Sequence, residues 1–321
     1  MNDTNLQQLS LLEEWIRPFS AIDTPYLKRL RYFYMAWLAG FVSIGVPGNI
    51  MVITSIISFK RLRQMSNLLV INLALFDLGV MSMNTLAFLG GIYGKELFTP
   101  MFCEISGTVC MVSCYGSLWS IMAIALNRYL FICHNPIYKS IFNWNTTFLY
   151  VGVIWVVVIC MDAPNMSYLG IGEHEFGYYN LHCGFRPSDD WWYNVFFYTG
   201  FAFIFPCCIT GYCYYSIWKS ATKMSGNVSE QRRKDQRQMT KSLIIIFCVF
   251  VMCWFPLSML IAFSGVFTQI EIPFEYWLVI EIWAHANSAL NFVVYGVTHS
   301  GFRRAYITIG SKVIPYLKAP K

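Results

Sequence analysis

Apolar residues run in long blocks along the chain, and short polar segments separate the blocks. Seven blocks are long enough to cross the hydrocarbon core of a bilayer as helices, which takes about 20 residues. They are 33–59, 68–92, 103–133, 147–168, 191–218, 240–265 and 274–298. The two-residue alternation of membrane β-barrels does not recur at strand length. The pattern therefore predicts an all-α fold, a bundle of seven transmembrane helices.

The composition supports a membrane protein and excludes a water-soluble one. Of the 321 residues, 56% are hydrophobic and only 12% are charged, about half of the charged fraction usual in soluble domains. The segment 1–32 lacks the apolar core of a cleaved signal peptide, so we expect the first span to direct insertion. We divide the chain into an N-terminal segment (1–32), a seven-helix domain (33–298) and a C-terminal segment (299–321).

Lysine and arginine residues are unevenly divided between the two sets of segments that join the spans. Most follow the first, third, fifth and seventh spans, with the densest run at 219–241. Such residues favour the cytoplasmic side, so we expect an extracellular N-terminus and a multi-pass protein of the plasma membrane. The net charge of +6 then suits acidic membrane lipids as partners. Because the basic residues are split among loops, nucleic-acid binding is not expected.

The cysteines divide in the same way. Of 11 cysteines, only Cys103 and Cys183 fall on the side expected to be extracellular, where disulfides form. We therefore predict a disulfide between them, which would pin the loop before the fifth span over the bundle. The other cysteines are expected to be small packing residues or thiols. Asn2 begins an N-glycosylation sequon on the same side.

Each predicted span carries a short motif, and the motifs keep a fixed order. They are Gly48-Asn49, Leu73 to Asp77, Asn127-Arg128-Tyr129, Trp155, Pro206 with Tyr214, Cys253-Trp254-Phe255-Pro256 and Asn291 to Tyr295. In these motifs the chain resembles the rhodopsin-like (class A) G-protein-coupled receptors. The resemblance implies a receptor rather than an enzyme, with a heterotrimeric G protein as partner. It also implies a short amphipathic helix at 301–306 along the inner membrane face.

Within that superfamily the chain is most similar to the melatonin receptors. Asn127 stands where most relatives carry Asp, and Phe292 stands where the seventh span usually carries proline. Ala163-Pro164-Asn165 and the run from Tyr129 to His134 also agree with that family. The resemblance implies a small-molecule agonist and an inhibitory-type G protein.

The ligand contacts of that family are matched only in part. Asn165 and Phe185 match the contacts of that family. The chain has Pro187 where the family has a glutamine and Ala202 where it has a histidine. A site built to hydrogen-bond a ligand discriminates strongly when such groups are missing. Two alternatives stay open: a melatonin-like ligand, or an orphan receptor for another small amphipathic ligand or a peptide.

Two other ligand classes are excluded at single positions. Amine receptors need an aspartate in the third span, and this chain has Cys110 at that position. Opsins need a lysine in the seventh span, and this chain has His285 there.

Polar groups at membrane depth suggest where a ligand binds, because such groups are rare unless they serve a function. Glu281 and His285 lie four residues apart, on one helical face. The full candidate set is Met111, Cys114, Asn165, Phe185, Ala202, Trp254, Glu281 and His285. As alternatives, Glu281 and His285 pair with each other or with another helix, Asp162 near Asn165 is interfacial, and Met111 and Cys114 only pack.

By resemblance, the inner half carries a sodium site and a switch. The expected sodium ligands are Asp77, Ser117, Asn287, Ser288 and Asn291, an oxygen-rich set suited to a hard cation; a water-linked network is the alternative. The expected switch and G-protein residues are Asn127, Arg128, Tyr129, Tyr214 and Tyr295. Asn127 and Gln236 replace acidic partners of Arg128, so ligand-independent signalling is predicted.

A transporter or channel is a remote alternative, since the sequence has neither an internal repeat nor a file of charged residues. The five histidines show no metal-ligand spacing along the sequence, and no cofactor other than the sodium ion is expected.

Overall fold

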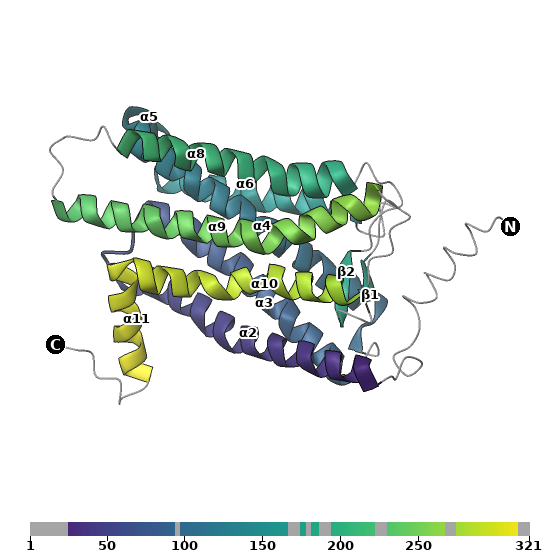
Figure 1. The fold of residues 1–321 in the computed structure, drawn as a ribbon. Coiled ribbons are helices and arrows are strands. Elements are labelled where there is room, and N and C mark those ends of the chain that lie inside the picture. Colours follow the sequence, from purple (N-terminus) through teal and green to yellow (C-terminus); the bar gives the residue numbers. More distant parts are fainter. Residues whose placement is uncertain are drawn as a thin grey trace.

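The computed structural model describes residues 25–93, 97–165, 174–177, 181–185, 194–221, 230–266 and 274–313. In this part of the chain, long helices run side by side as a bundle (Figure 1). They are α2 (Pro25–Ser58), α3 (Leu68–Tyr93), α4 (Pro100–Cys133), α6 (Trp144–Asp162), η6 with α8 (Asn194–Ile204 and Phe205–Ala221), α9 (Glu230–Val266) and α10 (Phe274–Thr298). The predicted all-α bundle of seven spans is confirmed.

Six of these helices are long and apolar enough to cross a membrane. The seventh, α10, is 25 residues long and packs against α2 and α9. Its hydropathy is lowered by His285, Asn287, Ser288 and Asn291, and all four of these side chains are buried. The seventh span is therefore an apolar helix with a polar face that points into the bundle.

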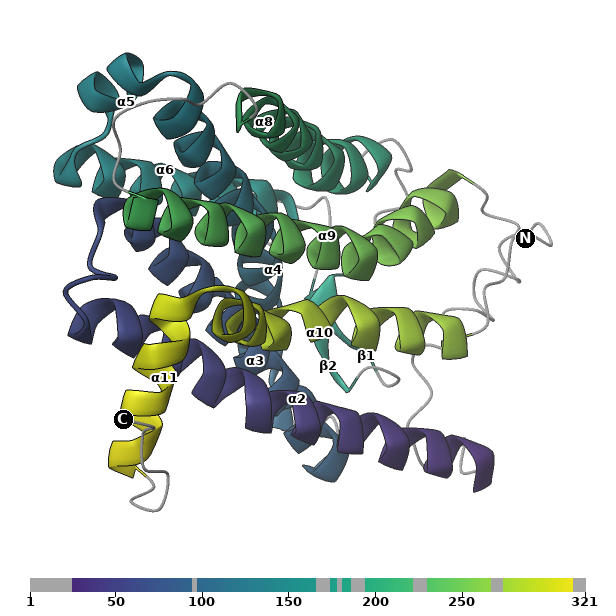
Figure 2. The ribbon, with the colours of Figure 1, turned by 60° about the vertical axis from the view of Figure 1, so that its left-hand side comes forward.

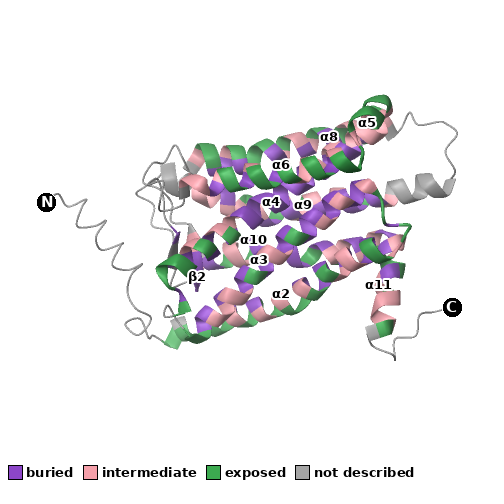
Figure 3. Cartoon of the chain, turned by 180° about the vertical axis from the view of Figure 1, so that it is seen from behind, coloured by how far each residue is buried: buried purple, intermediate pink, exposed green. Residues whose placement is uncertain are grey.

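Large apolar side chains cover the outside of the bundle. Phe148 and Val156 on α6 and Trp218 on α8 are exposed, and exposed residues follow the outer faces of the helices (Figure 3). An apolar surface this extensive would cause aggregation in water. It is the surface expected of helices in contact with lipid.

One end of the bundle carries a β-hairpin, which the sequence pattern does not predict. Strand β1 (His174–Gly177) pairs antiparallel with β2 (His182–Phe185), with Phe176 opposite Cys183 (Figure 2). The predicted disulfide between Cys103 and Cys183 is present, and it fastens β2 to the start of α4. We call this the hairpin end.

The opposite end, which we call the α11 end, carries two short helices. Helix α5 (Asn135–Ile141) follows α4, and α11 (Ser300–Val313) turns away from the bundle axis (Figure 1). Phe302 and Ala305 of α11 are buried while Arg303 and Arg304 are exposed. The predicted amphipathic helix is therefore present, and it is longer than the motif indicates.

Several helix boundaries differ from the apolar pattern. Helix α2 begins at Pro25, so part of the segment 1–32 is helical. Helix α9 begins at Glu230, so the basic run before the sixth span continues that helix. Asn2, the predicted glycosylation site, lies outside the described residues.

Helix α6 is attached to the bundle by two contacts of Trp155. Its indole Nε1 donates a hydrogen bond to Asn72 Oδ1 at 3.0 Å, and its ring stacks on Phe76 at 4.3 Å. A β-carbon on Gly116 would lie 2.3 Å from the Phe76 ring, so only glycine allows α4 to approach so closely. The Trp155 motif residue thus has a structural role.

Candidate functional site

Asp77 is the centre of a buried polar network that joins three helices. Its carboxylate is fully buried on α3. Oδ1 accepts a hydrogen bond from Ser117 Oγ of α4 at 2.9 Å, and Oδ2 accepts one from Asn291 Nδ2 of α10 at 2.7 Å. Buried polar groups stabilise a structure only when they are paired in this way.

The network extends to α2 and α9. Asn49 of α2 donates from Nδ2 to the Ser288 carbonyl at 2.9 Å. Asn287 Oδ1 accepts from Ser288 Oγ at 3.2 Å and from Trp254 Nε1 of α9 at 3.3 Å. The Ser288 hydroxyl also interacts with the Asp77 carboxylate, so all five candidates for the sodium site lie in one connected network.

The donor set of this network fits a hard cation. It combines the Asp77 carboxylate with hydroxyl and amide oxygens, the ligand types that such ions prefer. Asn49 Oδ1 is also buried nearby and has no hydrogen-bond partner among the described residues. Asp77, Ser117 and Ser288 are the residues that would hold a sodium ion there.

Trp254 lies between this network and the hairpin end. Its ring stacks on Phe250, with centroids 5.7 Å apart and planes inclined by 9°. Its centroid is also 6.3 Å from that of His285. A change at His285 can therefore reach the Asp77 network through a single side chain.

The predicted ligand pocket contains a buried thiol and imidazole cluster. The sulfur atoms of Cys110 and Cys114 and a ring nitrogen of His285 lie within 4.8 Å of one another. Of the other predicted lining residues, Ala202 of η6 is buried and Met111 of α4 is half-buried. Cys110 was not among the residues predicted to line the pocket, although its place at the amine-receptor aspartate position points to it.

Glu281 pairs with the hairpin rather than with its neighbour on α10. Its Oε1 lies 3.3 Å from Nε2 of His182 in β2. The ring of His182 also lies 6.2 Å from that of His285, measured between centroids. Of the alternatives for Glu281, pairing with another element is the one observed. Sequence reasoning missed His182, which no helical spacing indicates.

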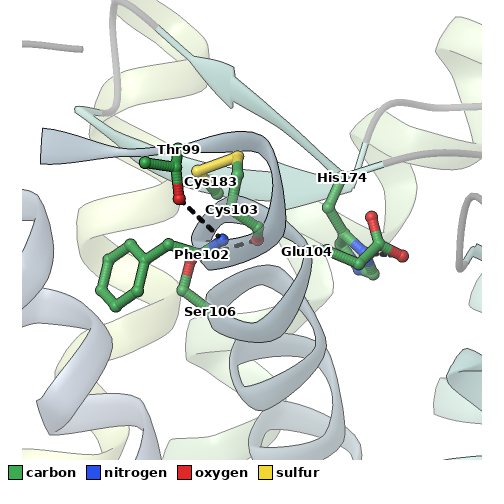
Figure 4. Close-up of a disulfide and its surroundings, with 7 residues drawn as sticks. All are labelled: Thr99, Phe102, Cys103, Glu104, Ser106, His174 and Cys183. Atoms are coloured by element: carbon green, nitrogen blue, oxygen red, sulfur yellow. Dashed lines mark hydrogen bonds and ion pairs between the residues drawn. A yellow bond between two sulfur atoms is a disulfide. The ribbon is translucent and has the colours of Figure 1, made fainter. Parts of the chain in front are cut away.

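A second ion-pair cluster lies beside the disulfide (Figure 4). His174 of β1 is buried, with Nδ1 3.5 Å from Glu104 Oε1 and Nε2 3.7 Å from Asp162 Oδ1. Asp162 is fully buried at the end of α6. Two helices and the hairpin meet at one histidine.

The two carboxylates change the protonation of His174. Burial lowers the pKa of His174, but Asp162 and then Glu104 raise it by more, so that it lies above its usual value. A protonated imidazole between two carboxylates is the form these neighbours favour.

Two predicted ligand contacts are placed by their backbone alone. Asn165 ends the short helix η4 (Ala163–Asn165), and Phe185 ends β2, opposite His174. Both therefore belong to the hairpin end. Their side chains, and all of Pro187, lie outside the described residues.

The switch residues gather at the α11 end. Asn127 and Arg128 are buried on α4, and Tyr214 of α8 and Tyr295 of α10 lie within electrostatic range of the Arg128 guanidinium. Neither tyrosine hydroxyl has a hydrogen-bond partner in the described part of the chain. Tyr129 lies apart from them, and its hydroxyl is 2.9 Å from His134 Nε2.

Helix α9 is held to α10 and α11 by polar contacts that sequence reasoning missed. Gln238 Oε1 accepts hydrogen bonds from Ser300 N at 3.3 Å and Ser300 Oγ at 3.0 Å. One turn further along α9, Ser242 is hydrogen-bonded to Thr298. The side chain of Gln236 lies outside the described residues.

Comparison with known proteins assigns the family. Residues 48–295 match the model of the 7 transmembrane receptor (rhodopsin family). The chain belongs to this receptor family. The match begins at the motif Gly48-Asn49 and ends at Tyr295, so it includes the Asp77 network and the switch residues.

Melatonin receptors are among the relatives of this receptor. The chain is 31% identical to the chicken (Gallus gallus) melatonin receptor type 1A over 83% of its own length and 76% of that protein. It is 29% identical to the human type 1B receptor, over 82% of the chain and 74% of that protein. Against the type 1C receptor of Xenopus laevis it is 29% identical, over 83% of the chain and 64% of that protein.

These matches establish a multi-pass membrane receptor of the plasma membrane, in a family of receptors and not of enzymes. A G protein and a small ligand are the partners that this family implies. The chain is similar to melatonin receptors, and its own ligand is a separate question.

Proposed function

We propose that this receptor binds a small, melatonin-like ligand at the hairpin end and activates an inhibitory-type heterotrimeric G protein at the α11 end. The observation that carries the proposal is the position of Trp254, between the His285 cluster and the Asp77 network. The similarity to melatonin receptors supports the ligand class.

The hairpin end faces the outside of the cell in this proposal, together with the N-terminus. The disulfide between Cys103 and Cys183 supports this orientation, because disulfides form in oxidising compartments. The excess of lysine and arginine in the segments at the α11 end supports it as well.

The ligand acts by moving Trp254. A ligand packed against His285 shifts the indole ring and weakens its hydrogen bond to Asn287. Pro256 removes a backbone hydrogen bond within α9, so the helix bends there. The outward swing of α9 then breaks the contacts of Gln238 and Ser242 and exposes Arg128 to the G protein.

Asp77, Ser117 and Ser288 would hold a sodium ion, and its charge would stabilise the resting arrangement of α3, α4 and α10. In that arrangement Trp254 donates its hydrogen bond to Asn287. Asn127 offers no negative charge to Arg128, so the resting state is held less tightly than with aspartate and basal signalling results.

A different small amphipathic ligand is the second candidate. The observation that favours it is Ala202, which is buried on η6 where the melatonin receptors are expected to carry a histidine. An alanine at that position cannot hydrogen-bond a ligand.

The test is G-protein activation in cells, first without ligand and then with micromolar melatonin. We expect basal activity above that of Arg128→Ala at matched surface expression. We also expect a melatonin response that Asn165→Ala removes. Asn145→Ala is the control, because Asn145 is exposed at the opposite end of α6, and it should leave the response intact.

Two results would contradict the proposal separately. Basal output equal to that of Arg128→Ala would disprove constitutive coupling. Basal output without a melatonin response would leave the receptor assignment in place and favour the second ligand candidate.

A further inference from the structure

The cluster at the hairpin end has the donor atoms of a metal site. Cys110 and Cys114 lie four residues apart on α4, so both thiols are on one face of the helix. The imidazole of His285 reaches them from α10, and the three donor atoms are within 4.8 Å of one another. All three residues are buried.

A fourth donor comes from the hairpin. The imidazole of His182 interacts with the Cys110 thiol, as does that of His285. Its Nε2 lies 3.3 Å from Glu281 Oε1, so Nδ1 is the nitrogen that we assign to the cluster. A histidine whose second nitrogen is held by a carboxylate is the usual arrangement of a metal ligand.

We propose that Cys110, Cys114, His182 and His285 form a Cys2His2 site for a zinc-class transition-metal ion, with Glu281 orienting His182. In tetrahedral zinc sites the Zn–S bonds are about 2.3 Å and the Zn–N bonds about 2.0 to 2.1 Å, so the donor atoms stand about 3.3 to 3.8 Å apart. The donors of Cys110, Cys114 and His285, now within 4.8 Å of one another, reach this spacing with side-chain shifts of about 1 Å. His182 must move toward them to complete the tetrahedron.

The chemistry of this cluster differs from that of the Asp77 network. Thiolate and imidazole ligands select zinc and similar ions, whereas carboxylate and carbonyl oxygens select hard ions. Within the described residues no other group of three such side chains comes together. Binding would therefore be confined to one place, and it would be distinguishable from any effect of sodium.

A bound ion would connect α4, α10 and β2 through their side chains. A ligand that binds only the folded state stabilises it in proportion to its concentration, so zinc is expected to raise the melting temperature of the receptor. This inference does not rest on the proposed ligand, because metal binding can be measured on the purified receptor without an agonist or a G protein.

The experiment uses the full-length receptor, purified in detergent with a tag that lacks histidine. It is stripped of metal under a reductant too mild to open the buried disulfide between Cys103 and Cys183. Co²⁺ is titrated as a spectroscopic probe, and Zn²⁺ is then added to displace it. We expect one Co²⁺ per receptor, with the near-ultraviolet thiolate band and the visible bands of tetrahedral cobalt. Zinc is expected to remove both.

The variants separate the site from the other thiols. Cys110→Ser and Cys114→Ser should each weaken the thiolate band, and the double variant should abolish it. His285→Gln should weaken binding at least tenfold. Glu281→Gln, which removes the partner of a ligand, should weaken binding about 10- to 100-fold. Cys213→Ser is the matched control, since this thiol is buried on α8 outside the cluster, and it should bind like the wild type.

A measurement on the unmodified chain keeps the test decisive if a variant fails to fold. Zinc should slow the alkylation of Cys110 and Cys114 near the melting temperature, where these buried thiols become reactive, and should leave the exposed Cys160 reactive, as read by mass spectrometry. Equal alkylation rates of Cys110 and Cys114 with and without zinc under these conditions would overturn the proposal. So would a cobalt thiolate band that survives in the double variant Cys110→Ser/Cys114→Ser.

Discussion

Two buried polar clusters lie on either side of Trp254, and they are built differently. The Asp77 network consists of hydroxyl, amide and carboxylate groups joined by hydrogen bonds of 2.7 to 3.3 Å. The cluster around His285 consists of thiols and imidazoles. The first includes Asn49, Asp77 and Asn291 of the sequence motifs, whereas no motif contains a residue of the second.

The clusters also differ in the elements on which they depend. Asp77, Ser117 and Asn291 belong to three long helices, so the bundle alone fixes their network. The His285 cluster includes His182 of β2, which is positioned by the neighbouring disulfide at Cys183. The inner part of the receptor is thus set by helix packing, and the hairpin end by a loop that one covalent bond holds in place.

Removing the disulfide should have the largest effect and should separate the two clusters. Cys103→Ser releases a crosslink across a sequence separation of 80 residues, and losing a native disulfide destabilises a protein by about 2 to 5 kcal/mol. We expect a lower melting temperature, reduced surface expression and loss of His182 from its cluster. Thermal unfolding and cobalt binding measure these effects.

The control is Cys160→Ser, which replaces an exposed thiol of α6. This substitution should change neither the melting temperature nor cobalt binding. If Cys103→Ser melted and bound cobalt like the wild type, the hairpin end would be held by its own packing. The contrast between the two clusters would then be wrong.

Truncating Asp77 tests the other cluster. In Asp77→Ala, Ser117 Oγ and Asn291 Nδ2 lose their acceptor inside the bundle, and an unsatisfied buried donor costs about 1 to 3 kcal/mol. We expect a destabilisation of about 2 to 4 kcal/mol in thermal unfolding. Asp77→Asn keeps the size and one oxygen, so it should be milder.

The hairpin end should be unaffected by either Asp77 variant once unfolding is corrected for. The readout would be cobalt binding at about 20 °C below the melting temperature, because the occupancy of a site and the stability of the folded state are linked. Loss of cobalt binding in Asp77→Asn would mean that the two clusters are one cooperative unit.

The sequence predicts the bundle and the inner network well, for physical reasons. Crossing a bilayer requires a long apolar block, so the spans are visible in hydropathy. The polar face of α10 lowers its hydropathy, and the motif from Asn291 to Tyr295 supports the span 274–298 that the apolar block indicates. The network residues are placed by long helices whose ends and faces follow from helical periodicity.

The hairpin end is harder to predict because tertiary contacts decide it. Strands β1 and β2 are four residues each, too short for a two-residue alternation to be recognised. Helical spacing correctly puts Glu281 and His285 on one face, but it cannot show that Glu281 pairs with His182. Nor does any local pattern bring His174 to Asp162, so the burial of this aspartate is unexpected from sequence.

The smallest expected effect is a pH dependence at the hairpin end. The pKa of His174 is raised in the folded receptor by Asp162 and Glu104, against the lowering effect of burial. The stabilisation is therefore complete below the unfolded value of about 6.5, and it is lost as the pH rises through the higher folded value. The hairpin should be held most firmly in mildly acidic solution.

The measurement is the melting temperature of the wild type minus that of His174→Gln, followed from about pH 5 to about pH 9. Taking the difference cancels the contributions to the melting temperature of groups that titrate in both proteins. The difference should be largest at the acidic end and should shrink with rising pH. Since Glu104 supplies part of the attraction, Glu104→Gln should move this transition to lower pH. A difference that grew with pH would mean that His174 is held as the neutral imidazole, and that its two carboxylate neighbours stabilise the hairpin without ion pairing.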